Sequence, residues 1–303
     1  MNKTKKAKRF PKKSLLFVIL LAGVYSIWTN APWRAHSVTQ NAGSPARSQI
    51  AFETQGATAD LPACTIPVRV GNIADTRCLE LINRDHKIGG EPADGRIVPA
   101  WPAVPVSAQT VSMHEMLLEA VRGLFAAARE ANAGSTFYVS SGYRDFEAQK
   151  KTYDEAPDKS FVQPPGCSEH QTGLAADILA LDIGQANMAV SREGQWLSQN
   201  AWKHGLILRY PEDKQGITNI SFEPWHFRYI GQPHAWYCRE NNLCLEEYIQ
   251  LLKASGGYRV MLDGAAYSVL YQIPRNGIIY VPEGLDYNIS GDNTGGYIIT
   301  ARG

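Results

Sequence analysis

One apolar run limits what this chain can fold into more than any other feature of its sequence. Residues 173–181 read GLAADILAL, a stretch of apolar side chains that follows a glycine and carries a single carboxylate, Asp177. The run predicts a buried strand. Burying an unpaired carboxylate would cost several kcal/mol or force it to take up a proton. The fold must therefore give Asp177 a partner, and a metal ion is one candidate.

Three further residues can complete a metal site with Asp177. His170 precedes it by seven positions, and Gly173 allows the chain to fold back between them, while Glu223 and His226 lie in the later stretch SFEPWHFRYIG. Two imidazoles and a carboxylate form a three-ligand set that zinc accepts, which leaves the second carboxylate as a general base. The alternative from these residues alone is a hydrogen-bonded aspartate with structural histidines.

The spacing of Glu223 and His226 excludes one familiar zinc motif. Pro224 lies between them and disfavours a helical interior, so the pair does not belong to an H-E-x-x-H helix. In an extended chain, residues three positions apart point to opposite faces. We therefore expect a turn at Pro224 and Trp225 to bring the two side chains together.

Charge is distributed unevenly along the 303 residues, although the formal net charge is only +1. Residues 1–13 form a basic end with seven Lys and Arg, which leaves 23 basic against 29 acidic side chains in the rest of the chain. This acidic body argues against nucleic-acid binding. Residues 14–28 form an uncharged, mostly apolar segment without a clear cleavage site. We expect a single-pass membrane anchor with an extracellular catalytic body, and a cleaved signal with secretion is the alternative.

Composition divides the remaining chain into three segments. Residues 29–60 are rich in Ala, Ser, Thr and Gln without an apolar period, which predicts a flexible stalk. Residues 61–255 contain the helix and strand patterns and the candidate site. After the pair Gly256 and Gly257, short β-type runs in residues 256–303 alternate with Gly, Pro, Asn and Asp, which predicts a small β appendage.

The patterns in the middle segment favour an α+β fold with a central, mainly antiparallel sheet flanked by helices. Ser112 and Glu115 form a capping-box pattern ahead of the first long helix. The expected helices cover residues 113–133, 145–154, 192–204 and 233–254, and the expected strands cover 135–141, 174–181, 206–210 and 226–230.

The five cysteines indicate disulfides if the body is exported. Cys238 and Cys244 lie six positions apart, and Cys64 and Cys78 bracket another short loop. The sequence therefore predicts these two pairs and leaves Cys167 over. A cysteine zinc site lacks a C-x-x-C pair, and free thiols are the alternative.

Several stretches, in order, resemble one family. SGYRDFEAQ, PGCSEHQTGLAADI and YPEDKQGITNISFEPWHFRYIG are similar to motifs of the VanY-type D-alanyl-D-alanine carboxypeptidases, which belong to the LAS group of zinc peptidases. The patterns S-x-H-x-x-G-x-A-x-D and E-x-W-H are met at every position, and the match runs over roughly residues 78–253. The resemblance implies a zinc peptidase domain and says nothing of the stalk or the β appendage.

The resemblance also implies a role for each candidate residue. His170, Asp177 and His226 would bind Zn²⁺. Glu223 would act as general base and then as acid for the leaving amine, while Arg144, in SGYR, would stabilise the oxyanion or the terminal carboxylate. The side chains expected to bind the end of the substrate are Arg144, Ser168 and Gln149.

The implied function is removal of the C-terminal D-alanine from peptidoglycan stem peptides, in cell-wall remodelling and in glycopeptide resistance. The same motifs also serve L,D-carboxypeptidases that act on tetrapeptide stems. A non-catalytic cell-wall-binding protein is an alternative of a different class. The expected partners are the stem peptide and, through the N-terminal segment, the membrane, with no obligatory protein partner and no nucleic acid.

Overall fold

The computed structural model describes residues 61–92, 96–133 and 137–303. In these ranges, no helix combines the length and the apolar character needed to cross a membrane. The predicted basic end, membrane anchor and stalk together occupy residues 1–60 and lie outside the described part of the chain.

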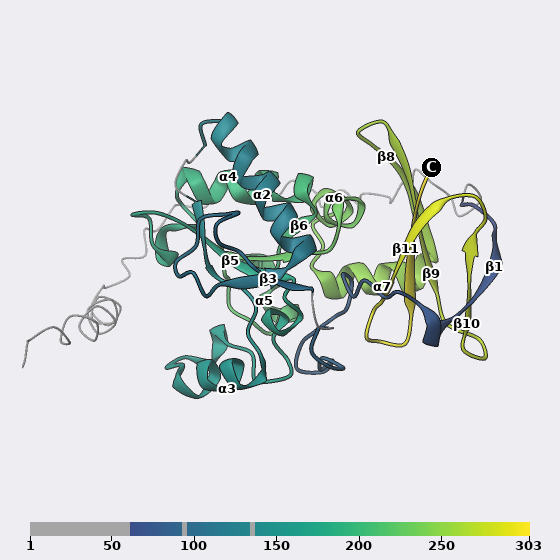
Figure 1. Ribbon diagram of the computed structural model, residues 1–303, viewed down its shortest axis with the longest axis horizontal. Helices are drawn as coiled ribbons and strands as arrows, with labels where there is room; N and C mark the ends of the chain where they lie inside the picture. Colours follow the sequence, from purple (N-terminus) through teal and green to yellow (C-terminus); the bar gives the residue numbers. More distant parts are fainter. Residues whose placement is uncertain (1–60, 93–95, 134–136) are drawn as a thin grey trace, which may run out of the picture. The chain divides into compact units, whose positions relative to one another are not determined.

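A four-stranded antiparallel sheet lies at the centre of the predicted peptidase domain (Figure 1). Every residue of its strand β5, which carries Asp177, is buried, as the apolar run predicts. This confirms the α+β class and the central antiparallel sheet. In spatial order the strands are β4 (Phe137–Ser141), β5 (Ala175–Ala180), β7 (His226–Tyr229) and β6 (Leu206–Leu208).

Two helices, α2 (Glu115–Glu130) and α4 (Arg192–Asn200), cover one face of this sheet. Val121 of α2 and Leu197 of α4 lie in one apolar cluster with Ile178 of β5.

The smaller elements of this domain are β2 (Ile97–Pro99), which pairs with β3 (Ser112–His114), and the helices α3 (Phe146–Glu155) and α5 (Gln215–Thr218). Single-turn 3-10 helices lie at Val70–Asn72, Lys159–Phe161, Glu169–Thr172, Gln185–Asn187, Ala201–His204 and Glu212–Lys214.

The first long helix starts later than its capping pattern predicts. Ser112 belongs to strand β3 and pairs with Pro99, so it does not cap the helix. The N-cap is His114, whose Nδ1 accepts a hydrogen bond from the backbone N–H of Met116 at 3.2 Å. A strand partner therefore overrides the local capping sequence.

The helix predicted over residues 233–254 is two helices. α6 (Gln232–Glu240) ends before Asn242, which has a φ of +49°, and α7 (Leu245–Ser255) begins after the N-cap Cys244. The left-handed asparagine interrupts the helix, and the apolar spacing that continues across it does not reveal the break.

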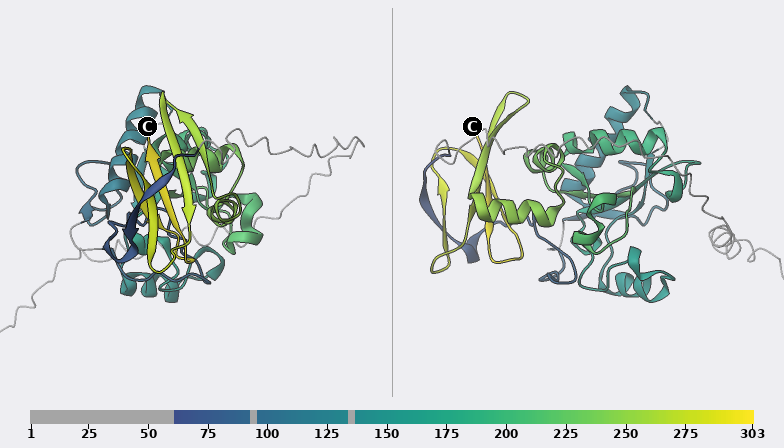
Figure 2. Two further views of the ribbon diagram at one scale, coloured as in Figure 1. Left: turned by 90° about the vertical axis from the view of Figure 1, so that its right-hand side faces the viewer. Right: turned by 180° about the vertical axis from the view of Figure 1, so that it is seen from behind.

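The C-terminal strands form the predicted β appendage (Figure 2). Most of them make a second antiparallel sheet in the order β11-β12-β9-β8. These strands are β11 (Asp286–Gly291), β12 (Tyr297–Arg302), β9 (Ala265–Gln272) and β8 (Gly257–Leu262).

One strand of the appendage comes from the other end of the described chain. β1 (Cys64–Arg69) pairs antiparallel with β10 (Ile278–Pro282), and Val68 packs against the buried Ile279 and its neighbours. β1, which the sequence analysis placed in the segment 61–255, therefore pairs and packs with the appendage.

The predicted disulfide between Cys64 and Cys78 is wrong, since both residues are free thiols. Cys64 lies on β1 within the appendage, where its Sγ is 3.8 Å from the carbonyl oxygen of Pro62. The Cys78 Sγ instead lies 3.8 Å from Sδ of Met116 on α2. The two thiols face different parts of the core, which their spacing in the sequence does not encode.

The predicted disulfide between Cys238 and Cys244 is also wrong, and Cys167 is a free thiol as well. Cys238 is buried in the last part of α6. Cys244 caps α7: its thiol accepts from the backbone N–H of Glu247, and the Glu247 carboxylate accepts from the Cys244 N–H. The second thiol thus serves the helix start, as a serine would in a capping box.

Candidate metal centre and active site

The three side chains expected to bind a metal lie together. Ligand atoms of His170, Asp177 and His226 are all within 4.8 Å of one another. Asp177 Oδ1 is 3.5 Å from His170 Nε2 and 3.0 Å from His226 Nδ1. Atoms that bind a tetrahedral zinc ion at about 2.0–2.1 Å stand ~3.3 Å apart. Both distances from Asp177 are close to that value, so the three side chains fit a zinc ion.

Strand pairing positions two of the three ligands. Asp177 on β5 lies directly opposite His226 on β7 in the antiparallel register. Their neighbours Ile178 and Phe227 are buried in the cluster beneath the helices. Because side chains alternate along a strand, Asp177 and His226 emerge together on the opposite face of the sheet.

His170 reaches the site from a 3-10 turn, Glu169–Thr172, rather than from the sheet. Gly173 ends this turn with a φ of +71°, the left-handed conformation that turns the chain into β5 and suits glycine. His170 Nδ1 donates to the carbonyl oxygen of Gly142 at 2.6 Å. This bond fixes the tautomer and leaves Nε2 directed at Asp177 as a metal ligand.

The turn expected at Pro224 and Trp225 is present. The N–H of His226 donates to the carbonyl oxygen of Glu223 at 3.1 Å, which closes a four-residue turn. Glu223 Oε2 lies 3.7 Å from His226 Nδ1, and the residue is only 5% exposed. A second carboxylate therefore stands beside the ligand cluster, as the spacing predicts.

Electrostatics favour a metal-binding charge state at two of the three ligands. Burial, with help from Arg144, lowers the pKa of His170 to about 4, so its imidazole is neutral at pH 7. Burial opposes ionisation of Asp177, but the two histidines outweigh it and hold its pKa well below the usual range. Burial also acts to lower the pKa of His226, but Asp177 and Glu169 outweigh it and raise the pKa to about 9. A metal ion therefore competes with a proton for His226.

Glu223 has the protonation behaviour that a general base needs. Burial raises its pKa to about 8, Asp177 and Glu169 add to the rise, and His226 and Arg144 oppose it. A carboxylate whose pKa lies near the working pH can both accept a proton and return it.

Arg144 lies close enough to Asp177 and Glu223 for their charges to act on its guanidinium, and two side chains hold it. Its Nη1 donates to Ser141 Oγ at 2.9 Å and its Nε donates to Gln149 Oε1 at 2.8 Å. Gln149 is fully buried, and its Nε2 donates to the carbonyl oxygen of Gln163 at 2.7 Å. Gln149 therefore orients Arg144, whereas the sequence predicted a direct contact with substrate. Ser168, two residues before His170, is buried beside the same turn.

The sequence interpretation missed the carboxylate behind His226. Glu169 is 1% exposed, and its Oε2 lies 3.6 Å from His226 Nε2, on the side of the ring away from Asp177. Neither of these two atoms has a hydrogen-bond partner within the described ranges. A carboxylate on this side of a metal-binding imidazole can orient the ring by accepting from its free N–H, and Glu169 stands at ion-pair distance from that nitrogen. The available signal was an acidic residue directly before a predicted metal ligand.

Tyr210 is a second residue that was missed. It is 4% exposed, and its ring centroid lies 4.9 Å from that of His226. Its carbonyl oxygen accepts from the N–H of Glu223 at 3.1 Å. Tyr210 therefore packs against a ligand and anchors the turn that carries the base.

Comparison with known proteins agrees with this geometry. The family model described as VanY, D-alanyl-D-alanine carboxypeptidase, matches residues 110–232. The bifunctional D-Ala-D-Ala dipeptidase and D-Ala-D-Ala carboxypeptidase VanXYC of Enterococcus gallinarum is 34% identical over 182 residues, which make up 56% of this chain and 92% of that protein. The chain belongs to the VanY family of D-alanyl-D-alanine carboxypeptidases.

Other VanY-type proteins extend the likeness. A D-alanyl-D-alanine carboxypeptidase of Enterococcus faecium is 42% identical over 189 residues, which cover 61% of this chain and only 57% of that protein. Among solved structures, the vancomycin resistance D,D-dipeptidase VanXYg, in complex with a D-Ala-D-Ala phosphinate analog, matches with a TM-score of 0.67 at 29% identity. The match covers 78% of this chain and 98% of VanXYg.

Proposed function

We propose that this chain is a zinc-dependent D,D-carboxypeptidase that removes the C-terminal D-alanine from peptidoglycan stem peptides. The observation that carries the proposal is the convergence of His170, Asp177 and His226 on one point, with Glu223 and Arg144 beside it. The substrate class is supported by relatives named for action on D-Ala-D-Ala.

The residues divide the work of hydrolysis between them. Zinc held by His170, Asp177 and His226 supplies a Lewis acid for the scissile carbonyl and a nucleophile at neutral pH. Glu223 takes up the proton released when the nucleophile attacks and passes it to the departing amino group. Its carboxylate lies 3.7 Å from the ligand His226, beside the point where both transfers occur.

Arg144 supplies positive charge to the substrate. Ser141 and Gln149 engage two of its N–H groups, and the guanidinium has five. The others are available to an anion, either the terminal carboxylate of the peptide or the oxyanion that develops during attack. Its rigid attachment favours the second role, because fixed donors need no reorganisation during the reaction.

The proposal includes an extracellular location. Stem peptides lie outside the cytoplasmic membrane, and the apolar segment 14–28 that follows the basic end supports export with retention as a single-pass anchor. Fractionation of cells with an antibody against residues 61–303 tests this: recovery in membranes supports the anchor, and recovery in the medium contradicts it.

Defined peptides test the activity. Full-length protein, with its zinc content measured, is incubated with a pentapeptide stem ending in D-Ala-D-Ala and with the matching tetrapeptide, and products are identified by mass spectrometry. We expect D-alanine from the pentapeptide only, loss of release after chelation and recovery with Zn²⁺. Release from the tetrapeptide alone identifies an L,D-carboxypeptidase instead. No release from either peptide by the zinc-loaded protein contradicts an enzymatic function.

A further inference from the structure

We infer that the β appendage is a positioning element for the metal ligand His226, acting through the linking segment, residues 75–81, and then through Arg228 and Glu169. The inference rests on the proposed function, because it concerns the zinc site. It gives the appendage a role in the catalytic centre, in place of that of a separate module.

The first step joins His226 to Glu169. Because His226 Nδ1 faces Asp177, its Nε2 faces the opposite way, where Glu169 Oε2 lies 3.6 Å away. The other oxygen of Glu169 is 2.7 Å from Arg209 Nε and 2.9 Å from Arg228 Nη1. All of these side chains are almost completely buried. The orientation of the ligand ring therefore depends on where the two guanidinium groups hold Glu169.

The second step joins Arg228 to the linking segment. Arg228 is 0% exposed, so only protein groups compensate its charge. Its ion pair with Glu169 is close, although the angle at Nη1 falls outside hydrogen-bond geometry. Its Nη2 donates to the carbonyl oxygens of Cys78 at 3.0 Å and Glu80 at 3.1 Å. The backbone of the linking segment thus determines where the Arg228 guanidinium lies.

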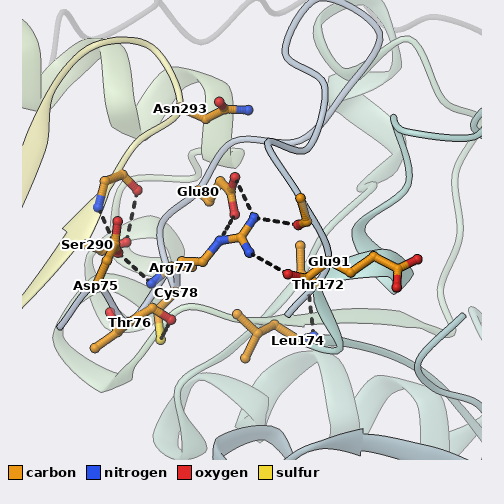
Figure 3. A network of polar contacts seen from close by, with 12 residues as sticks. Asp75, Thr76, Arg77, Cys78, Glu80, Glu91, Thr172, Leu174, Ser290 and Asn293 are labelled. Carbon is orange, nitrogen blue, oxygen red and sulfur yellow. Dashed lines mark hydrogen bonds and ion pairs between the residues drawn. The ribbon is translucent and has the colours of Figure 1, made fainter. Parts of the chain in front are cut away.

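Hydrogen bonds connect the linking segment to the appendage (Figure 3). The N–H of Leu79 donates to Ser290 Oγ at 2.9 Å, and the N–H of Leu81 donates to the carbonyl oxygen of Asp292 at 3.1 Å. These bonds flank the carbonyl groups that Arg228 binds. Two further contacts tie the same parts: Thr76 N–H to the Ile289 carbonyl at 2.9 Å, and Gly291 N–H to Asp75 Oδ1 at 3.1 Å.

Within the linking segment, side chains limit other conformations. Arg77 has a φ of +56°, which is uncommon for a residue with a side chain. Its Nε lies 2.8 Å from Glu80 Oε2, and its Nη2 donates to the carbonyl oxygen of Gly90 at 3.0 Å (Figure 3). These contacts and those with the appendage hold the linking segment in the conformation in which its carbonyl groups face Arg228.

A shared core argues against an appendage that works as an independent wall-binding module. Ile249 of α7 lies in one apolar cluster with Tyr258, Val269 and Ile298 of the appendage strands. His234 of α6 adds a buried contact, since its Nε2 is 2.9 Å from Thr300 Oγ1 on β12. A module that docks through its surface would not need to share a core in this way.

Zinc affinity is the quantity that separates positioning from simple stability. The dissociation constant of the full-length protein for Zn²⁺ is measured by competition with a chelating indicator in the wild type and three variants. Glu169→Gln should weaken zinc binding about 10–100-fold, the usual cost of losing an outer partner of a ligand. Ser290→Ala, in the appendage, should weaken it about fivefold, the equivalent of one hydrogen bond. Ser268→Ala removes another buried hydroxyl from the same sheet and should leave zinc affinity unchanged.

The kinetics at saturating zinc give a second readout. Glu169→Gln should lower kcat with little change in KM, because a misaligned ligand affects the transition state more than peptide binding. Wild-type zinc affinity in Ser290→Ala would refute the role of the appendage, even if its melting temperature falls. Wild-type affinity in Glu169→Gln would refute the first step. Failure of the wild type itself to bind zinc would instead overturn the proposed function.

Discussion

Arg144→Lys tests whether Arg144 stabilises the negative charge that develops on the substrate during the reaction. A lysine keeps the positive charge, but its ammonium group is a point charge on a flexible stem and cannot replace a planar fork. In the structure the fork is fixed by Ser141 at 2.9 Å and by Gln149 at 2.8 Å. The substitution therefore removes fixed geometry while it keeps charge.

The structure sets the expected magnitude. Loss of one fixed donor to an oxyanion lowers kcat about 10²–10³-fold. Gln149→Met keeps the guanidinium but removes the bond to its Nε, which should lower kcat/KM about fivefold. It also removes the bond from Gln149 Nε2 to the Gln163 carbonyl, and that loss should lower stability. Because Gln149 is fully buried and acts only through Arg144, the double variant should be no worse than Arg144→Lys alone.

Steady-state release of D-alanine from the pentapeptide, with zinc content confirmed for each variant, provides the four sets of constants. Loss of kcat indicates stabilisation of the oxyanion, whereas a rise in KM alone indicates a grip on the terminal carboxylate. Wild-type constants for Arg144→Lys would remove Arg144 from the site. Additive losses in the double variant would show that Gln149 contacts the substrate itself, contrary to the bonding described here.

Three further predictions concern the base, a buried cation and pH. Glu223→Gln should retain zinc at the wild-type ratio while turnover falls about 10²–10⁴-fold, and metal analysis showing zinc loss would contradict its role as the base. Arg209→Met removes the cation from two buried ion pairs and should lower the free energy of unfolding by about 3–5 kcal/mol, measured in urea, whereas the exposed control Arg239→Met should change it by less than about 0.5 kcal/mol. Burial lowers the pKa of His234 to about 3, so the folded protein cannot take up the proton that the unfolded chain binds below its pKa of 6.5. Stability should therefore fall as pH decreases from 6.5 toward 3, by about 1.4 kcal/mol per pH unit from this group, and identical slopes for the wild type and His234→Gln would contradict the assignment.

The ligand cluster could be predicted from the sequence because its geometry is mostly local. Seven positions and a glycine separate His170 from Asp177, and a single turn separates Glu223 from His226. The local sequence does not predict that β5 pairs with β7, which brings Asp177 beside His226. The family resemblance alone indicated that these residues belong to one site.

The supports of the cluster could not be predicted in the same way. Glu169 meets Arg209 and Arg228 only through the register of strands that lie 40 or more positions away in the sequence. Apolar patterning predicts that a strand exists, but not which strand lies beside it. Cysteine spacing has the same limitation, because it says nothing about where a thiol points: the Cys244 thiol caps a helix.

Strands β1 and β10 pair with each other although they are synthesised at very different times. β1 is among the first described residues to be synthesised, and its partner follows some 200 positions later, so β1 has no strand partner until those residues have been made. The same delay applies to the bond between Leu79 and Ser290, which are 211 positions apart. Contacts this distant in sequence slow folding, because a long loop must close before they form. The contacts that complete the support behind the metal ligand therefore depend on residues 256–303, which are synthesised after α2 and the central sheet.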